Sequence, residues 1–75
     1  MIDEEKYEIT IGSDLERDGM FLEITEPSKP ANCYLEIFYS DVTNTFTISL
    51  FKENIDLEIV DEAIRIAKYR LVPIL

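Results

Sequence analysis

Apolar and polar residues alternate along four segments in the first two thirds of the chain, and this is the period of a β-strand with one buried face. The third segment carries apolar residues on both faces, which is typical of a central strand. The connections are short and rich in Gly, Pro, Asp, Asn and Ser, so they favour an antiparallel meander. The four predicted strands cover residues 6–11, 20–26, 32–40 and 46–52.

The period changes to that of a helix after residue 53. Asp56 is a good N-cap, acids occupy the first turns and bases the last ones, so the pattern predicts a helix over residues 56–72 that ends before Pro73. A second apolar stripe lies beside the main one, and it indicates either packing under the N-terminal segment or the 72–75 tail, or a homodimer contact. The main stripe is Leu57, Val60, Ile64, Ala67 and Leu71, and the second is Ile59, Ala63 and Ile66.

Together these elements predict one α+β domain over residues 1–75, a four-stranded antiparallel meander sheet (about 6–52) with one C-terminal helix packed on one face (β-β-β-β-α). We expect Leu35, Ile37, Ile48, Ile64 and Ala67 to be buried where the helix meets the sheet. The expected inner face of the sheet is its more aliphatic set, namely Ile9, Ile11, Leu22, Ile24, Leu35, Ile37, Ile48 and Leu50.

One helix covers one face of a sheet, so the other face is expected to meet solvent. By alternation this outer face combines four aromatic side chains with three glutamates, a composition typical of a protein-binding patch. The register of strand 46–52 is the least fixed, because a slip of one residue exchanges its two faces. The expected outer face holds Glu8, Thr10, Phe21, Glu23, Thr25, Tyr34, Glu36, Phe38, Thr47, Ser49 and Phe51.

The charge of the chain restricts its partners. Sixteen acidic and seven basic residues, with no histidine, give a net charge of −9. Such a protein repels nucleic acid and anionic membranes and is attracted to basic surfaces. Residues 1–26 hold nine acids and two bases, a net −7 that folding does not explain, whereas the charges of the helix complement its dipole. We therefore expect a basic protein partner, no nucleic acid and no membrane.

Candidate chemistry is sparse. Residues 14–19 match the start of an EF-hand loop, but Thr25 stands where a bidentate Glu is needed and Arg17 adds a positive charge, so an acidic hairpin connection with a turn glycine is the better interpretation. A thin sheet offers no cleft to raise the pKa of a carboxylate pair such as Glu23 and Glu36, and Cys33 has no histidine to activate it. The sequence therefore predicts no enzyme, no metal site and no cofactor.

The same features bear on location. A lone cysteine favours a reducing compartment, and residues 1–6 do not resemble a signal peptide, so we expect a cytoplasmic protein. The predicted partner-binding residues are Phe21, Glu23, Tyr34, Glu36 and Phe38 on the sheet, with Asp14, Glu16 and Asp18 in the first loop.

Segments 33–39 and 46–51, followed by the helix 57–71, resemble the small acidic immunity proteins of bacterial polymorphic toxin systems in size, charge and layout. The resemblance implies a cytoplasmic protein that neutralises one cognate toxin by direct binding. Small acidic phage proteins that inhibit host nucleases share these features. The expected function is thus that of an inhibitor of a basic target such as a nuclease. The alternative is a dimeric structural or assembly module without an inhibitory role.

Overall fold

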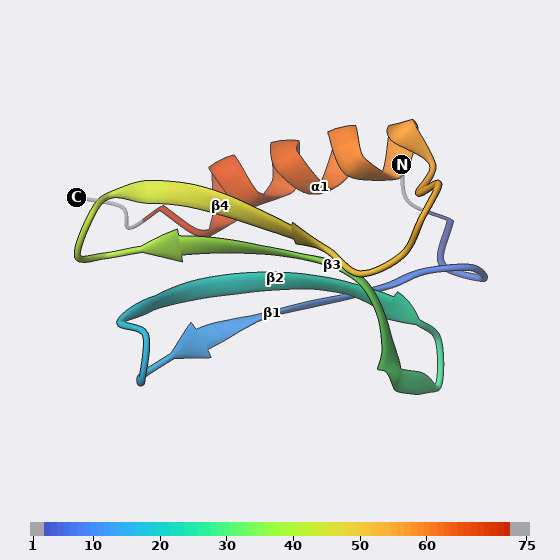
Figure 1. The fold of residues 1–75 in the computed structure, drawn as a ribbon, viewed down its shortest axis with the longest axis horizontal. Coiled ribbons are helices and arrows are strands. Elements are labelled where there is room, and N and C mark those ends of the chain that lie inside the picture. Colours follow the sequence, from blue (N-terminus) through green and yellow to red (C-terminus); the bar gives the residue numbers. More distant parts are fainter. Residues whose placement is uncertain (1–2, 73–75) are drawn as a thin grey trace.

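A computed structural model describes residues 3–72 of the chain. Within this range four antiparallel strands form one open sheet in the order β1-β2-β3-β4, and a single helix follows them, so the predicted β-β-β-β-α fold is confirmed (Figure 1). The elements are β1 (Glu8–Asp14), β2 (Gly19–Glu26), β3 (Lys29–Ser40), β4 (Thr45–Leu50) and α1 (Leu57–Arg70).

Each hairpin closes at a residue with a left-handed backbone. Asp18 (φ 52°), Ser28 (φ 63°) and Asn44 (φ 57°) end the three connections, and Asp and Asn are the non-glycine residues that tolerate this conformation best. Gly19 was predicted to supply the backbone conformation of the tight first turn. This is wrong, because the residue with positive φ is Asp18. Gly19 is needed for space instead: a Cβ there would lie 2.1 Å from the backbone oxygen of Tyr39.

The helix begins as predicted but packs with a different face. The carboxylate of Asp56 accepts a hydrogen bond from the backbone N–H of Glu58, which confirms the N-cap. Leu57 and Ile64, from the predicted main stripe, are 78% and 38% exposed, so the prediction that Ile64 is buried is wrong. The buried helical positions are Ile59, Ala63, Ala67 and Leu71.

These four positions are spaced by four residues and satisfy the helical period as well as the predicted stripe does. The second stripe therefore packs on the sheet itself, and the homodimer contact suggested for it is wrong because Ile59 and Ala63 lie in the monomer's own core. The expected stop at Pro73 lies outside the described residues; α1 ends at Arg70, and the N–H of Leu71 bonds to the carbonyl of Ala67.

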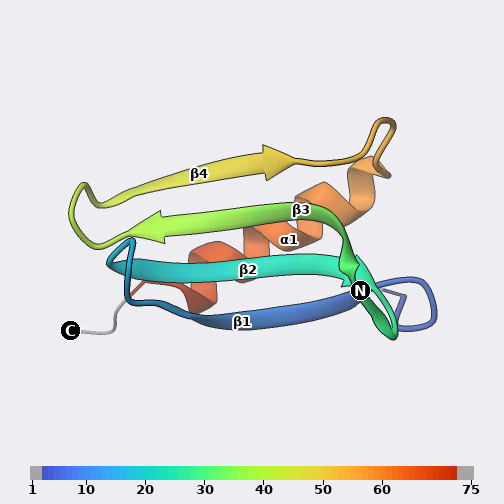
Figure 2. The same cartoon turned by 60° about the horizontal axis from the view of Figure 1, so that its bottom comes forward.

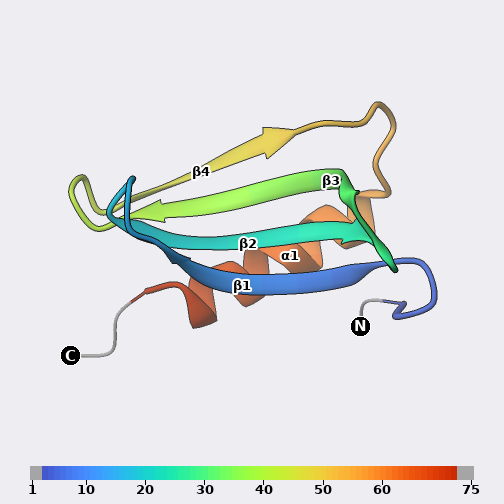
Figure 3. The same ribbon diagram turned by 90° about the horizontal axis from the view of Figure 1, so that it is seen from below.

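The helix covers the middle of the sheet rather than all of it. Figures 2 and 3 show α1 behind β2 and β3, with β4 set apart along one edge. Leu22, Ile24, Leu35 and Ile37 are buried there, as predicted. The inner face of β4 is left open, so the predicted burial of Ile48 and Leu50 is wrong; the remaining inner-face residues, Ile9 and Ile11 of β1, are half-buried against the core.

A β-bulge interrupts the alternation of β3. Ile24 pairs with Leu35 but Thr25 pairs with Cys33, so Tyr34 is an extra residue in the ladder. Tyr34 packs against the core and meets the ring of Tyr7 edge-on at 5.2 Å. Thr25 is only 3% exposed. The prediction that Tyr34 and Thr25 face solvent on the outer face is therefore wrong.

Candidate protein-binding surface

The outer face of the sheet is built from cross-strand rows of side chains. In an antiparallel ladder, residues directly opposite each other point to the same side. One row runs Thr10, Glu23, Glu36 and Ser49, and the next runs Gly12, Phe21, Phe38 and Thr47. The register thus places two carboxylates side by side and two aromatic rings side by side. We call Phe21, Glu23, Glu36 and Phe38 the acidic–aromatic face.

The two rings of this face lie over the two glycines of the chain. A Cβ on Gly12 would come within 2.8 Å of the Phe21 ring, and a Cβ on Gly19 within 2.5 Å of the Phe38 ring. Glycine at these positions lets each ring lie close to the backbone, which explains why both phenylalanines are half-buried on a face that no helix covers.

Arg17 from the β1–β2 loop lies across this face. Its guanidinium carbon is 4.1 Å from the centre of the Phe38 ring, a cation–π contact. Its terminal nitrogens donate hydrogen bonds of 3.2 and 2.9 Å to the two oxygens of Glu36. The Nε atom donates to Asp14. Glu36 and Asp14 hold the pKa of Arg17 above its ordinary value.

The loop that carries Arg17 is held by local hydrogen bonds. The Asp14 carboxylate accepts 3.1 Å hydrogen bonds from the backbone N–H groups of Glu16 and Arg17. The side-chain hydrogen bond from Arg17 is the main reason why the pKa of Asp14 lies below its ordinary value. The loop is therefore a hairpin connection with an internal ion pair. Glu16 and Asp18 are exposed on it.

A shallow hollow of about 350 Å³ adjoins the two carboxylates on the same side of the sheet. Cys33 lines it together with Glu23, Glu36, Phe51 and Lys52, because the bulge exchanges the sides on which residues 33 and 34 lie. Burial, reinforced by the charge of Glu23, raises the pKa of the Cys33 thiol. A raised pKa lowers the thiolate fraction at neutral pH, so this environment does not favour a nucleophilic cysteine.

The structure thus brings together four of the eight predicted site residues, Phe21, Glu23, Glu36 and Phe38, and links Asp14 to them through Arg17. It places Glu16 and Asp18 on the adjoining loop and Tyr34 away from the face. Arg17 also belongs to this surface, although it was not among the predicted site residues. The sequence contains one indication of this role, because Arg17 is the single basic residue between Lys6 and Lys29 and stands among acids that it could pair with.

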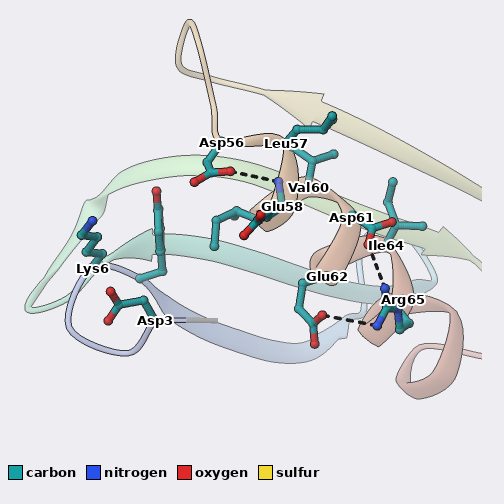
Figure 4. A pocket seen from close by; sticks show the side chains of 12 residues that line it. Asp3, Lys6, Asp56, Leu57, Glu58, Val60, Asp61, Glu62, Ile64 and Arg65 are labelled. Atoms are coloured by element: carbon teal, nitrogen blue, oxygen red, sulfur yellow. Dashed lines mark hydrogen bonds and ion pairs between the residues drawn. The ribbon is translucent and has the colours of Figure 1, made fainter. Parts of the chain in front are cut away.

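A second hollow of about 810 Å³ lies between the N-terminal turn and the start of α1 (Figure 4). Local contacts account for four of its five acids: Asp56 caps the helix, Asp61 and Glu62 pair with Arg65 at 2.8 and 3.7 Å, and Asp3 accepts a hydrogen bond from the backbone N–H of Glu5. Tyr7 also lines this groove, and burial raises its pKa. Because local structure accounts for most of these charges, the outer face is the better candidate.

Within residues 3–72, no cluster of three or more Cys, Asp or Glu side chains has the geometry to hold a metal ion. The 14 residues of α1 fall short of a membrane-spanning helix. Comparisons of the chain with models of protein families, with curated proteins and with solved structures found no match.

Proposed function

We propose that this chain is a small acidic protein-binding module, and that its acidic–aromatic face binds an arginine-bearing surface of a basic protein. The observation that carries the proposal is the position of Arg17. Its guanidinium stacks on Phe38 and pairs with both oxygens of Glu36. An aromatic ring face beside a carboxylate is what a guanidinium group requires. A partner's arginine could replace Arg17 with the same contacts.

Glu23 supports the same proposal. It lies directly opposite Glu36 in the ladder, and like charges at this position destabilise a sheet. Arg17 forms an ion pair with Glu36, whereas Glu23 has no ion pair among the described residues. A second cationic side chain from a partner would offset this repulsion. The face therefore favours a partner with two or more neighbouring basic residues.

The net charge of −9 suits an inhibitor of a basic target such as a nuclease, as in the immunity-type proteins that the chain resembles. A strong negative field speeds association with a basic surface and weakens as salt is added. The target class is tested by coexpression with the protein encoded beside this gene, where loss of that protein's toxicity supports inhibition. No loss, or a gene surrounded by housekeeping genes, favours the alternative of a structural module.

The binding face is tested by NMR titration with hexa-arginine peptide, using two variants that change the net charge equally. Arg17→Ala removes the internal competitor, whereas Arg65→Ala removes a cation that pairs with Asp61 and Glu62 on α1. We expect Arg17→Ala to bind the peptide several-fold more tightly than Arg65→Ala, with the largest shifts at Glu36 and its neighbours. Equal affinities for the two variants, or shifts centred on α1, would refute the proposed face.

A further inference from the structure

The two edges of the sheet differ in their protection against pairing with another chain. Edge strands are usually blocked by charge, proline or a bulge. The edge strand β1 carries Glu8 and Asp14 at its ends, whereas β4 (Thr45–Leu50) contains no charged residue, no proline and no glycine. Its ladder with β3 is regular from Leu35↔Leu50 to Ser40↔Thr45. The edge formed by β4 is therefore open to a further strand.

The side chains of β4 are also incompletely packed. Phe46, Ile48 and Leu50 face the helix side of the sheet, next to Tyr39, Ile37 and Leu35 of β3. They remain 37%, 43% and 58% exposed because α1 lies over β2 and β3. Within residues 3–72, each of them has a cross-strand neighbour on the β3 side and none on the other. A further strand would supply the missing neighbours.

The hydrogen-bond pattern shows which backbone groups of β4 point to the open edge. The N–H of Phe51 donates to the carbonyl of Tyr34 at 2.9 Å, which makes these two residues a hydrogen-bonded pair. Hydrogen-bonded and non-hydrogen-bonded pairs alternate along an antiparallel ladder. Residues 45, 47 and 49 therefore bond to β3, and the N–H and C=O groups of Phe46, Ile48 and Leu50 point outward.

We propose that β4 pairs with β4 of a second copy of this chain, antiparallel, about a two-fold axis that passes beside Ile48. In this register Ile48 lies opposite Ile48 of the second copy, and Phe46 lies opposite Leu50. Phe46, Ile48 and Leu50 then each belong to a hydrogen-bonded pair with the second copy. Their outward N–H and C=O groups therefore all find a partner. The apolar side chains of both copies meet on the helix side of one continuous sheet.

Charge favours a second copy as the occupant. Two molecules of net charge −9 repel each other, so they approach best where the surface is least charged. Residues 41–52 hold one acid, Asp41, and one base, Lys52, and therefore sum to zero. On the helix side of this edge, Phe46 and Ile48 line an apolar hollow together with Lys68 of α1, which is basic and so adds no negative charge there. A basic protein would gain nothing from this neutral edge, whereas the edge is complementary to itself under a two-fold axis.

The pairing is independent of the proposed function and compatible with it. Because the contact is made edge to edge, it leaves the acidic–aromatic face of each copy free. A two-fold axis perpendicular to the sheet keeps both helices on one side and both acidic–aromatic faces on the other. The dimer would present two binding faces on one continuous surface, which permits bivalent binding.

Sedimentation equilibrium over a range of concentrations tests the proposal. We expect the wild-type mass to rise from 8.7 kDa toward twice that value as concentration increases. Added salt should tighten the dimer, because it screens the repulsion between copies, whereas it should weaken binding to a basic partner. Ile48→Lys should remain monomeric, and Thr10→Lys, an exposed position on the opposite edge strand, should dimerise at least as well as wild type. A wild-type monomer throughout, or an Ile48→Lys variant that dimerises like wild type, would overturn the proposal.

Oxidative cross-linking in a Cys33→Ser background tests the register. Hydrogen-bonded antiparallel pairs have Cα atoms about 5.5 Å apart, within the range of a disulfide. Ile48→Cys should therefore form a disulfide-linked dimer. Leu50→Cys should not, because residue 50 of the second copy lies four positions along the strand, about 14 Å away. Cross-linking of Leu50→Cys as efficient as that of Ile48→Cys would refute the register.

Discussion

Replacement of Gly19 by alanine is the sharpest test of how β2 packs on β3. The new methyl carbon would lie 2.1 Å from the backbone oxygen of Tyr39 and 2.5 Å from the Phe38 ring. Cβ contacts in proteins are essentially never below 3.0 Å, so the two groups must separate by 3.0 − 2.1 = 0.9 Å. The oxygen belongs to a strand and cannot rotate away, so the ladder itself has to shift.

The cost follows from two opposing effects. Overpacking of this kind destabilises proteins by about 1–3 kcal/mol, and weakening a ladder hydrogen bond adds about 1 kcal/mol. Against this, alanine restricts the unfolded chain and restores about 0.4–1 kcal/mol. The net loss is about 1–3 kcal/mol, a large part of the stability of so small a domain. For this chain length, such a loss lowers Tm by about 5–20 °C.

Thermal unfolding followed by circular dichroism measures this effect, and Gly12→Ala is the matched control. At Gly12 the methyl carbon would meet the far end of the Phe21 ring at 2.8 Å, and this ring can move outward because the face is open. We expect Gly12→Ala to lower Tm less than Gly19→Ala does. If Gly19→Ala leaves Tm unchanged or raises it, the close approach of β2 and β3 at this point is incorrect.

Two further predictions concern the core and the acid stability of the protein. In urea unfolding, Leu35→Ala should lower the free energy of unfolding by about 2–5 kcal/mol, because Leu35 is 0% exposed. Ile64→Ala should lower it clearly less, because Ile64 is 38% exposed. Equal losses for the two variants would contradict the observed helix face. Arg17 holds the pKa of Asp14 below its ordinary value of 3.8, so Asp14 stabilises the fold fully above that ordinary value, and this contribution is lost as the pH falls from there through the lowered pKa. Asp14→Asn should therefore make Tm less dependent on pH below about 4, and the same dependence in Asp14→Asn as in wild type would refute the ion pair.

Much of the candidate site could be predicted because a strand alternates with a period of two residues. Phe21, Glu23, Glu36 and Phe38 lie on regular parts of β2 and β3, so local pattern and short connections were enough to place them on one face. Tyr34 was misplaced because the bulge inserts an extra residue at that point. A bulge depends on how two strands meet, and the alternation within either strand does not reveal it.

The sequence by itself determined the order of the elements, the N-cap of the helix and the faces of the regular strands, since these depend on neighbours within a few positions. The tertiary structure decided which of two helical stripes is buried, because both satisfy the helical period and the choice depends on the direction in which α1 crosses the sheet. That direction covers β2 and β3 and leaves Ile48 and Leu50 open. It was likewise tertiary structure that laid Arg17 on Phe38 and Glu36, because an ion pair across 19 positions forms only when folding brings the loop and the strand together.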